Sequence, residues 1–494
     1  MRNVRLSCLA ILALAACMTA PQPVTGVQAL QAGQLMSAQI ASPQEPIAQP
    51  LSLYDAMARA LRYNLDYRVA LMELDVAQAD LGLSAYDKLP DIVASGQYYG
   101  RSNRAGASSL SLISGRQSLE PSTATEPQFQ TASLAASFNI LDYGLSTIRH
   151  AQIVNEAFIS QERSHKATSD ILRDVHRAYW RMAAYKRFQD EYAVIERDIQ
   201  KALENSKGLY DSAKTNPIKA LKSYRDVNRL AEQAQRAVEG FETAQIELAK
   251  LMGLPPDQSY TVLMPEDKRL PPPLSMSFGA MIELALTQRP EMRETVYAQR
   301  ITQAEIRKAV LETLPSLEGF TGLNVNSNQF LFNADWVNYG AKASWNIMKV
   351  FSLGHRKRKA KTNIELEEQR GVAVAMAVVT QLGISRLRYD ILRNEYERQQ
   401  GDVEAQNKIM AHSQVLFRAG AMSHQTYVQE QLHSLIAQAR SDAAYSELQD
   451  AAAQIHTALG YGVYEADISA RQDLPMMAAS LRAYWEGPQG WPAI

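Results

Sequence analysis

Strict alternation of apolar and polar residues marks several short segments of the chain as β-strands. From residue 337 to 347 every second position is apolar or small, and the positions between are polar or glycine. A period of two predicts a strand with one apolar face and one polar face. The apolar positions are Val337, Tyr339, Ala341, Ala343, Trp345 and Ile347.

A second alternating segment supplies a counterpart near residue 135. Its apolar positions are Ala132, Leu134, Ala136, Phe138 and Ile140, with Ala135 as the one irregular position. The stretches after Pro90 and Pro315 are expected to form two further strands, which gives β-hairpins at 90–141 and 315–350. Strands of about ten residues are long enough to cross a bilayer as part of a barrel. The alternative, half-buried strands in a soluble sheet, fits less well with two hairpins placed among long helices.

Helical periodicity follows each hairpin over a long stretch. No proline or interior glycine occurs between Gly144 and Lys207, so a helix of about 60 residues and about 90 Å is expected there. Its partner carries an apolar seam with steps of four and three, which is typical of helices packed side by side, as in a coiled coil. Antiparallel helix pairs are therefore expected at 144–253 and 352–460. The seam is Leu230, Ala234, Ala237, Phe241, Ala244, Leu248 and Leu251, and 207 residues later Ala437, Ser441, Ala444, Leu448, Ala451, Ile455 and Ala458.

The chain repeats itself, which explains why each element occurs twice. At an offset of 225, Leu89-Pro90 lies over Leu314-Pro315, and at an offset of 207, residues 137–140 lie over 344–347. The difference of eighteen residues indicates an insertion in the first copy, within the Ser/Thr/Gly-rich stretch 101–127. We expect a first repeat at 51–253, a Pro-rich linker at 254–277 and a second repeat at 278–464. An extended arm at 17–50 precedes the repeats and a tail at 465–494 follows them.

The first residues resemble the signal peptide of a bacterial lipoprotein. Arg2 and Arg5 precede a short apolar run, and Leu14-Ala15-Ala16-Cys17 is similar to a lipobox. Residues 1–16 would then be removed, and Cys17 would carry the lipid anchor. The alternative is an ordinary signal peptide cleaved nearby, with Cys17 incidental.

Composition narrows the functional classes. The chain has 494 residues with 51 basic and 52 acidic side chains, so the overall charge indicates no nucleic-acid partner. No nucleophile elbow, phosphate-binding loop, dinucleotide glycine motif or zinc-protease helix motif occurs, and the eight histidines lack metal-ligand spacing. We therefore expect no enzyme, no cofactor and no metal site.

Two copies of a short helix pair, a β-hairpin and a long helix pair, behind a lipobox, resemble the TolC family of outer-membrane efflux proteins, and the anchor resembles its OprM-like branch. The resemblance covers about residues 51–464. It implies an α+β membrane fold in which a homotrimer closes a 12-stranded β-barrel, continued by a long antiparallel α-helical barrel in the periplasm. It also implies an exit duct for a tripartite efflux or type I secretion system. The alternative from the residues alone is a periplasmic structural coiled-coil lipoprotein without a pore.

The resemblance also implies partners and docking positions. The partners are a periplasmic adaptor (membrane fusion) protein, an inner-membrane transporter of RND, ABC or MFS type, and outer-membrane lipid. The turns at the far ends of the helix pairs would dock the adaptor, and residues 101–127 and 326–335 would be extracellular loops. The docking residues are Ala213 and Thr215 in the first copy and Gly420, Ala421 and Ser423 in the second.

Two further features of the second copy bear on the channel. Some family members carry carboxylates six and nine residues after the tip glycine, where this chain has Thr426 and Gln429. Thr426 and Gln429 are therefore expected to form a polar, uncharged periplasmic constriction. The basic run His355-Arg356-Lys357-Arg358-Lys359 indicates contact with lipid head groups or a basic girdle in the lumen, unless it is merely a solvated face.

Overall fold

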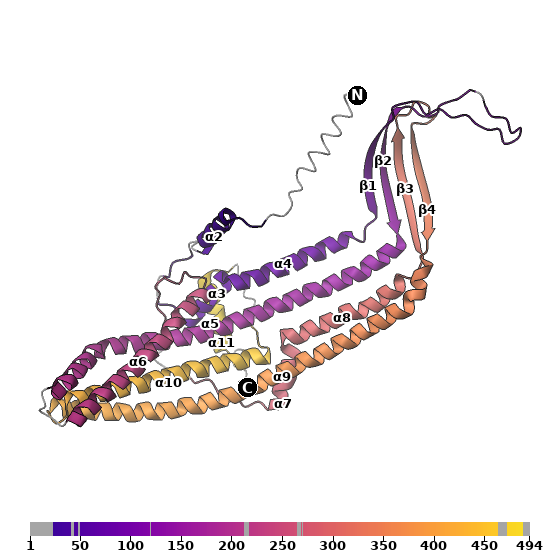
Figure 1. Cartoon of the computed structure of the whole chain (residues 1–494). Coiled ribbons are helices and arrows are strands. Elements are labelled where there is room, and N and C mark those ends of the chain that lie inside the picture. Colours follow the sequence, from indigo (N-terminus) through magenta and orange to yellow (C-terminus); the bar gives the residue numbers. More distant parts are fainter. Residues whose placement is uncertain are drawn as a thin grey trace. The chain divides into compact units, whose positions relative to one another are not determined.

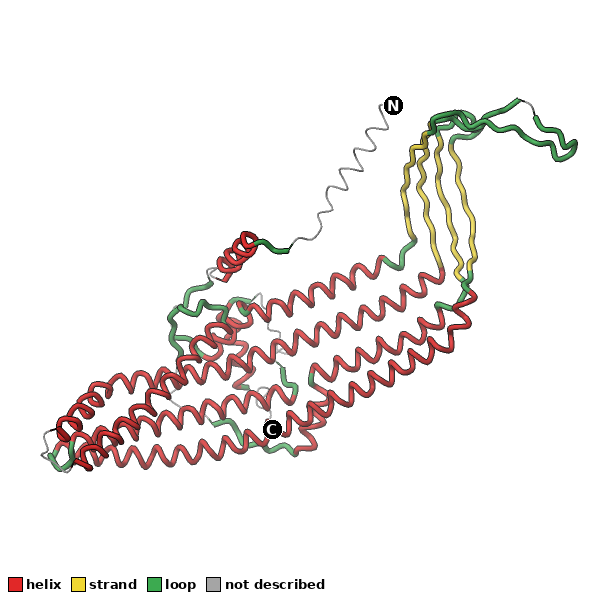
Figure 2. Tube along the Cα trace, in the orientation of Figure 1, coloured by secondary structure: helices red, strands yellow, loops and turns green. Residues whose placement is uncertain are grey.

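The computed structural model describes residues 23–40, 44–47, 50–118, 120–211, 217–263, 268, 270–462 and 472–487 (Figures 1 and 2). The chain divides into two compact units, and each is described by itself. The first unit comprises Met1–Asn64, Ala178–Asp267 and Ile409–Ala439. The second unit comprises Leu65–Arg177, Lys268–Lys408 and Arg440–Ile494.

A four-stranded antiparallel sheet lies in the second unit (Figure 2). Its strands pair in chain order, so the two hairpins lie side by side through the β2–β3 pairing. The strands are β1 (Asp91–Gly100), β2 (Gln128–Asn139), β3 (Ser316–Asn326) and β4 (Asp335–Ser344).

The register of the sheet separates an apolar face from a polar face. Leu134 lies opposite Ala94 on one side and Leu323 on the other, and Leu323 lies opposite Val337. The next row along belongs to the other face, where Ser133 lies opposite Ser95 and Asn324. Side-chain hydrogen bonds cross the polar face, including Ser95 Oγ to Ser133 Oγ at 2.7 Å and Asn324 Nδ2 to Asn338 Oδ1 at 2.5 Å.

Each long helix begins within three residues of the end of a strand, earlier than the alternating pattern suggested. Helix α5 (Ile140–Asp211) and helix α9 (Ile347–Arg418) start at residues that the pattern assigned to strands. In the first copy the Asn139 side chain accepts hydrogen bonds from the backbone N–H groups of Leu141 and Asp142, which satisfies helix donors that would otherwise lack partners. In the second copy β4 ends at Ser344, and the Trp345 indole donates to Thr313 O at 2.9 Å.

Shorter helices complete the second unit and are held by polar contacts. They are α4 (Leu65–Tyr86), α7 (Phe278–Gln288), α8 (Pro290–Leu311), the later part of α10 (His424–Leu459) and α11 (Leu474–Glu486). Ser84 of α4 bonds His150 of α5 at 2.8 Å, and Gln152 of α5 donates to Glu305 of α8 at 2.7 Å. Arg356 of α9 pairs with Glu312, just after α8, at 2.6 Å.

The first unit is a helical body around α3 (Leu53–Tyr63), α6 (Pro217–Leu251) and parts of α5, α9 and α10. Ser52 and Asp55 form a reciprocal capping box that starts α3. Tyr179 of α5 is buried, and its hydroxyl donates to Leu51 O at 3.2 Å and Leu263 O at 2.5 Å. These bonds hold the residues before α3 and the start of the linker against α5.

The seam residues of α6 and α10 are buried wherever the structure describes their side chains, except that Leu251 is half-buried. Helices α6 and α10 also end alike. Gly253 and Gly460, which the repeat places 207 residues apart, both have positive φ, 68° and 84°. The two copies therefore share their helix stop as well as their hydrophobic seam.

Residues 17–50 were expected to form an extended arm, and this was wrong for part of the range. Gly26–Ile40 forms helix α2, in which every residue is exposed. The segment lacks proline and is rich in Ala, Gln and Leu, which favour helix when no competing pairing exists. None of the described helices has an apolar stretch long enough to cross a membrane.

Candidate functional site

The sheet ends on both sides in a strand with a free edge. β1 pairs with β2 and β4 pairs with β3, and among the described residues no other strand pairs with the outer edges of β1 and β4. Unpaired backbone groups along strands of this length are a template for pairing with another chain. The apolar face is also uncovered, since Leu134, Leu323 and Tyr339 are 48%, 56% and 83% exposed. Among the described residues, the sheet therefore leaves two strand edges unpaired and one apolar face uncovered.

The turn between α9 and α10 is a tight reversal built on Gly420. Its φ is 71°, and the backbone N–H groups of Gly420 and Ala421 donate to Phe417 O and Leu416 O at 3.0 and 2.9 Å. This pair of hydrogen bonds forms a Schellman motif, which ends a helix through a residue of positive φ. Ser423 Oγ then accepts from the Thr426 N–H at 3.2 Å, so Ser423 caps α10.

Aromatic rings brace this turn from inside. Phe417 stacks on Tyr427 with ring centroids 4.4 Å apart and an angle of 5°, and the His424 ring lies 5.9 Å from Phe417. The contacts join the last turn of α9 to the first turn of α10. The turn residue Ala421 remains exposed.

The positions expected at the constriction lie just after the turn. Thr426 is exposed, and its hydroxyl lies 2.9 Å from Ser423 Oγ, whereas Gln429 is half-buried. Both side chains are uncharged. The corresponding turn of the first copy, with Ala213 and Thr215, lies outside the described residues, and so does Cys17.

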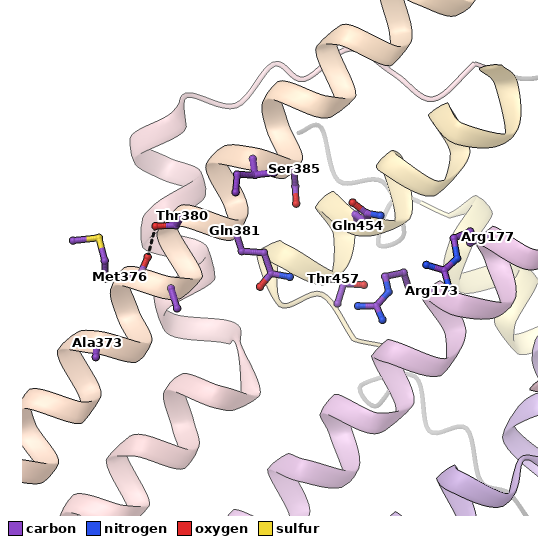
Figure 3. A pocket seen from close by; sticks show the side chains of 11 residues that line it. Arg173, Arg177, Ala373, Met376, Thr380, Gln381, Ser385, Gln454 and Thr457 are labelled. Atoms are coloured by element: carbon purple, nitrogen blue, oxygen red, sulfur yellow. Dashed lines mark hydrogen bonds between the residues drawn. The ribbon is translucent and has the colours of Figure 1, made fainter. Parts of the chain in front are cut away.

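A pocket with both polar and apolar lining residues lies in the second unit between α5, α9 and α10 (Figure 3). Arg173 and Arg177 of α5 line one side, and Gln381 of α9 and Gln454 of α10 line others. Arg173 pairs with Asp170 at 2.8 Å and Asp174 at 3.0 Å. Asp174 also lies 3.7 Å from the Arg177 guanidinium, so Asp170 and Asp174 together balance the charges of both arginines.

Beside this pocket a buried carboxylate sits among arginines. Burial raises the pKa of Asp450, and Arg388, whose Nη2 lies 3.5 Å from Asp450 Oδ2, opposes that shift. Gln454 also donates to Asp450 at 2.8 Å. The pocket brings together no nucleophile and base, and no described group of three or more His, Cys, Asp or Glu side chains could hold a metal ion.

Sequence reasoning missed the docking of the C-terminal helix α11. Its Leu481 and Trp485 are buried, and the Trp485 ring lies 4.5 Å from His456 of α10 and 5.9 Å from His176 of α5. The signal in the sequence was the spacing Met477, Leu481, Tyr484, Trp485, which is the period of one helix face. This face was assigned to an undefined tail because it is short and isolated.

Comparisons with known proteins show which proteins this chain resembles. No protein-family model matches it. It is 24% identical over 340 residues to the cation efflux system protein CusC of Escherichia coli K12, covering 64% of each chain, so the match spans less than two thirds of that relative. It is 23% identical over 398 residues to the probable outer membrane lipoprotein SilC of Salmonella typhimurium, covering 74% of this chain and 77% of SilC. The CmeC outer membrane channel of Campylobacter jejuni superposes with a TM-score of 0.65 at 16% identity, over 87% of this chain and 89% of CmeC.

The chain has the TolC-like fold. The expected TolC-like fold, a mainly helical chain with a small four-stranded sheet, is therefore confirmed. CusC, SilC and CmeC are named as an efflux protein, a lipoprotein and a channel, and none of the three is named as an enzyme.

Proposed function

We propose that this TolC-like chain is the outer-membrane exit duct of a tripartite efflux or type I secretion system. The observation that carries the proposal is the sheet with two free edges and one uncovered apolar face, each hairpin of which continues into a helix of 72 residues. Three copies joining β4 of one to β1 of the next would make twelve strands and leave no edge, and about eight strands are the fewest that close a barrel. The apolar faces would then meet lipid and the polar faces the lumen.

The same proposal gives the cellular location of the chain and of its lipid anchor. The homotrimer lies in the bacterial outer membrane, anchored through a lipid on Cys17, with the helical part in the periplasm. The TolC-like relatives named as an outer membrane lipoprotein and an outer membrane channel support this location. Conduction needs no catalytic group and no cofactor.

The partners follow from the position of the duct. Substrate arrives from an inner-membrane transporter of RND, ABC or MFS type through a periplasmic adaptor protein. Gly420, Ala421 and Ser423 form the adaptor-docking turn of the second copy, and the exposed Ala421 is available for contact. We propose the same docking role for Ala213 and Thr215 of the first copy. Three copies each of Thr426 and Gln429 make an uncharged constriction at the entrance.

Conductance in planar bilayers tests the duct. The purified protein is expected to give small channel steps while the entrance is closed. The double variant F417A/Y427A removes the stacked rings that join α9 to α10, and larger steps are expected from it. A matched control is F158A/Y297A, which removes a ring pair 5.2 Å apart in the second unit.

The competing function, a periplasmic coiled-coil lipoprotein without a pore, predicts different behaviour. Such a protein would stay in solution without detergent once the lipid is removed, and neither the native chain nor F417A/Y427A would conduct. Correctly folded protein that never conducts in either form would overturn the exit-duct proposal.

A further inference from the structure

The start of α9 carries an exposed surface that is apolar at one end and basic at the other. The proposed duct does not explain this surface. We call it the junction patch and define it by Trp345, Ile347, Met348, Phe351, Lys357, Arg358 and Lys359. Met348 and Phe351 are 72% and 75% exposed, and Trp345 and Ile347 are each 55% exposed. Lys357, Arg358 and Lys359 are exposed as well.

The two halves of the patch meet along one side of α9, where Lys357 and Lys359 flank Arg358. Phe351 and Arg358 are seven residues apart, which is nearly two full turns, so they share a side about 10 Å apart along the axis. The opposite side of the helix is covered, since Ala360 is buried and Arg356 pairs with Glu312 at 2.6 Å. Within the single chain, the patch is therefore the uncovered side of a helix that is packed on its other side.

No acidic residue balances the basic half. The sequence has no Asp or Glu from residue 336 to 364, and no described carboxylate lies within ion-pair distance of Lys357, Arg358 or Lys359. The apolar half borders a groove of about 510 Å³ lined by residues 344–348. An elongated partner with a negatively charged head and an apolar tail matches this order of surfaces.

We propose that the junction patch binds an anionic phospholipid, with the acyl chain against Met348 and Phe351 and the phosphate at Lys357, Arg358 and Lys359. The proposal rests on the proposed function, because it places the patch where the sheet meets the periplasmic leaflet. Trp345 fits that level, since tryptophan is enriched at membrane–water interfaces, and lysine and arginine side chains reach head groups while their stems cover apolar surface. A basic girdle inside a water-filled lumen would not explain exposed Phe351 and Met348 on the same side.

Native mass spectrometry of the full-length protein in detergent tests this directly. We expect the wild type to retain phosphatidylglycerol in preference to phosphatidylcholine. The variant K357Q/R358Q/K359Q should lose that preference by about fivefold for each cation removed, on the order of a hundredfold in all. The matched control K207Q/K219Q/K222Q removes three exposed lysines from α5 and α6 and should keep the preference. If the triple variant does not fold, R358Q alone should lower the preference for phosphatidylglycerol by about fivefold.

Further variants and a competing anion distinguish a bound phospholipid from other ligands of the patch. The variant M348S/F351S should bind both lipids more weakly while it keeps the preference for phosphatidylglycerol. Unchanged binding would contradict the proposed contact of the acyl chain with Met348 and Phe351. Glycerol phosphate, which lacks acyl chains, should not compete; equal competition would make the patch an anion site and overturn the lipid. Equal retention of the two lipids by the wild type would also overturn the proposal. Wild-type conductance is scored separately, so a conducting protein without lipid preference loses this inference alone.

Discussion

At the scale of single residues, the turn between α9 and α10 shows how local chemistry sets a functional position. Gly420 supplies the positive φ of 71°, Ser423 caps the next helix, and Phe417 stacks on Tyr427 across the turn. Each contact lies within twelve residues of sequence, so glycine and serine in this order were enough to predict the reversal. The ring stacking was not predicted, because two aromatic residues ten positions apart meet only after the chain has turned back.

Replacement of Gly420 by alanine should loosen this turn. A side chain at positive φ costs about 1–2 kcal/mol, so the amides around the turn should exchange faster with deuterium in G420A. Gly401 is the control, because it lies inside α9 and a Cβ there meets nothing within 4 Å. G401A should slow exchange, since alanine favours a helix over glycine by about 0.5–1 kcal/mol. Equal effects of the two changes would contradict the role given to Gly420.

At the scale of elements, alternation identified β2 and β4, and the stretches after Pro90 and Pro315 were expected to be the other two strands, but the pattern did not show where the strands end. Trp345 and Ile347 continue the alternating pattern of β4, yet the strand ends at Ser344 and α9 begins at Ile347. Periodicity cannot separate the two states over so few residues, and the hydrogen bonds of Asn139 and Trp345 decide the boundary. Helix α2 was missed for the opposite reason, because no apolar face marks a helix that buries nothing.

Neighbouring residues of β2 test the two faces of the sheet. Leu134 belongs to the apolar face and Ser133 to the polar face. Arginine on a lipid-facing strand position costs about 2–4 kcal/mol at the middle of a bilayer, whereas a lumen position keeps it in water. We therefore expect L134R to lower the yield of protein folded into lipid bilayers strongly, and S133R to lower it little. The reverse order would mean that the faces are assigned the wrong way round.

The docking of α11 should depend on pH through two buried histidines. Burial lowers the pKa of His176 to about 3, and burial together with the nearby His176 lowers that of His456 to about 3. Both rings are neutral when α11 is docked, so undocking becomes favourable as pH falls below the ordinary histidine value of 6.5. At pH 5 each histidine would contribute about 2 kcal/mol to release, if the undocked pKa is the ordinary one.

Hydrogen exchange of α11 as a function of pH measures this release. Protection of residues 474–486, corrected for the intrinsic rate, should fall between pH 6.5 and pH 4 in the wild type. In H176F/H456F, which keeps aromatic rings beside Trp485, protection should stay constant across that range. H412Q, at an exposed position of α9, should behave as the wild type does. Constant protection in the wild type would show that histidine protonation does not control docking.

At the scale of the whole molecule, the two repeats and the long helix pairs were readable from the sequence because their periods are long and repeat. The resemblance they supported predicts a TolC-like fold, and the structure has that fold. The pocket beside Arg173 and the α11 cluster were not readable, because each joins residues from three helices that are far apart in sequence. In the described part of the single chain, the outer edges of β1 and β4 are unpaired. These two edges underlie the proposal that three chains close one barrel.

Native mass spectrometry of the detergent-extracted complex shows whether the barrel closes in this way. The mass of one chain is 54.9 kDa before any processing. A closed barrel of twelve strands predicts a complex of three chains that withstands mild activation, because every strand edge is paired within it. A single chain that stays in solution without detergent, with Tyr339 and Leu134 covered within that monomer, would contradict the closed barrel.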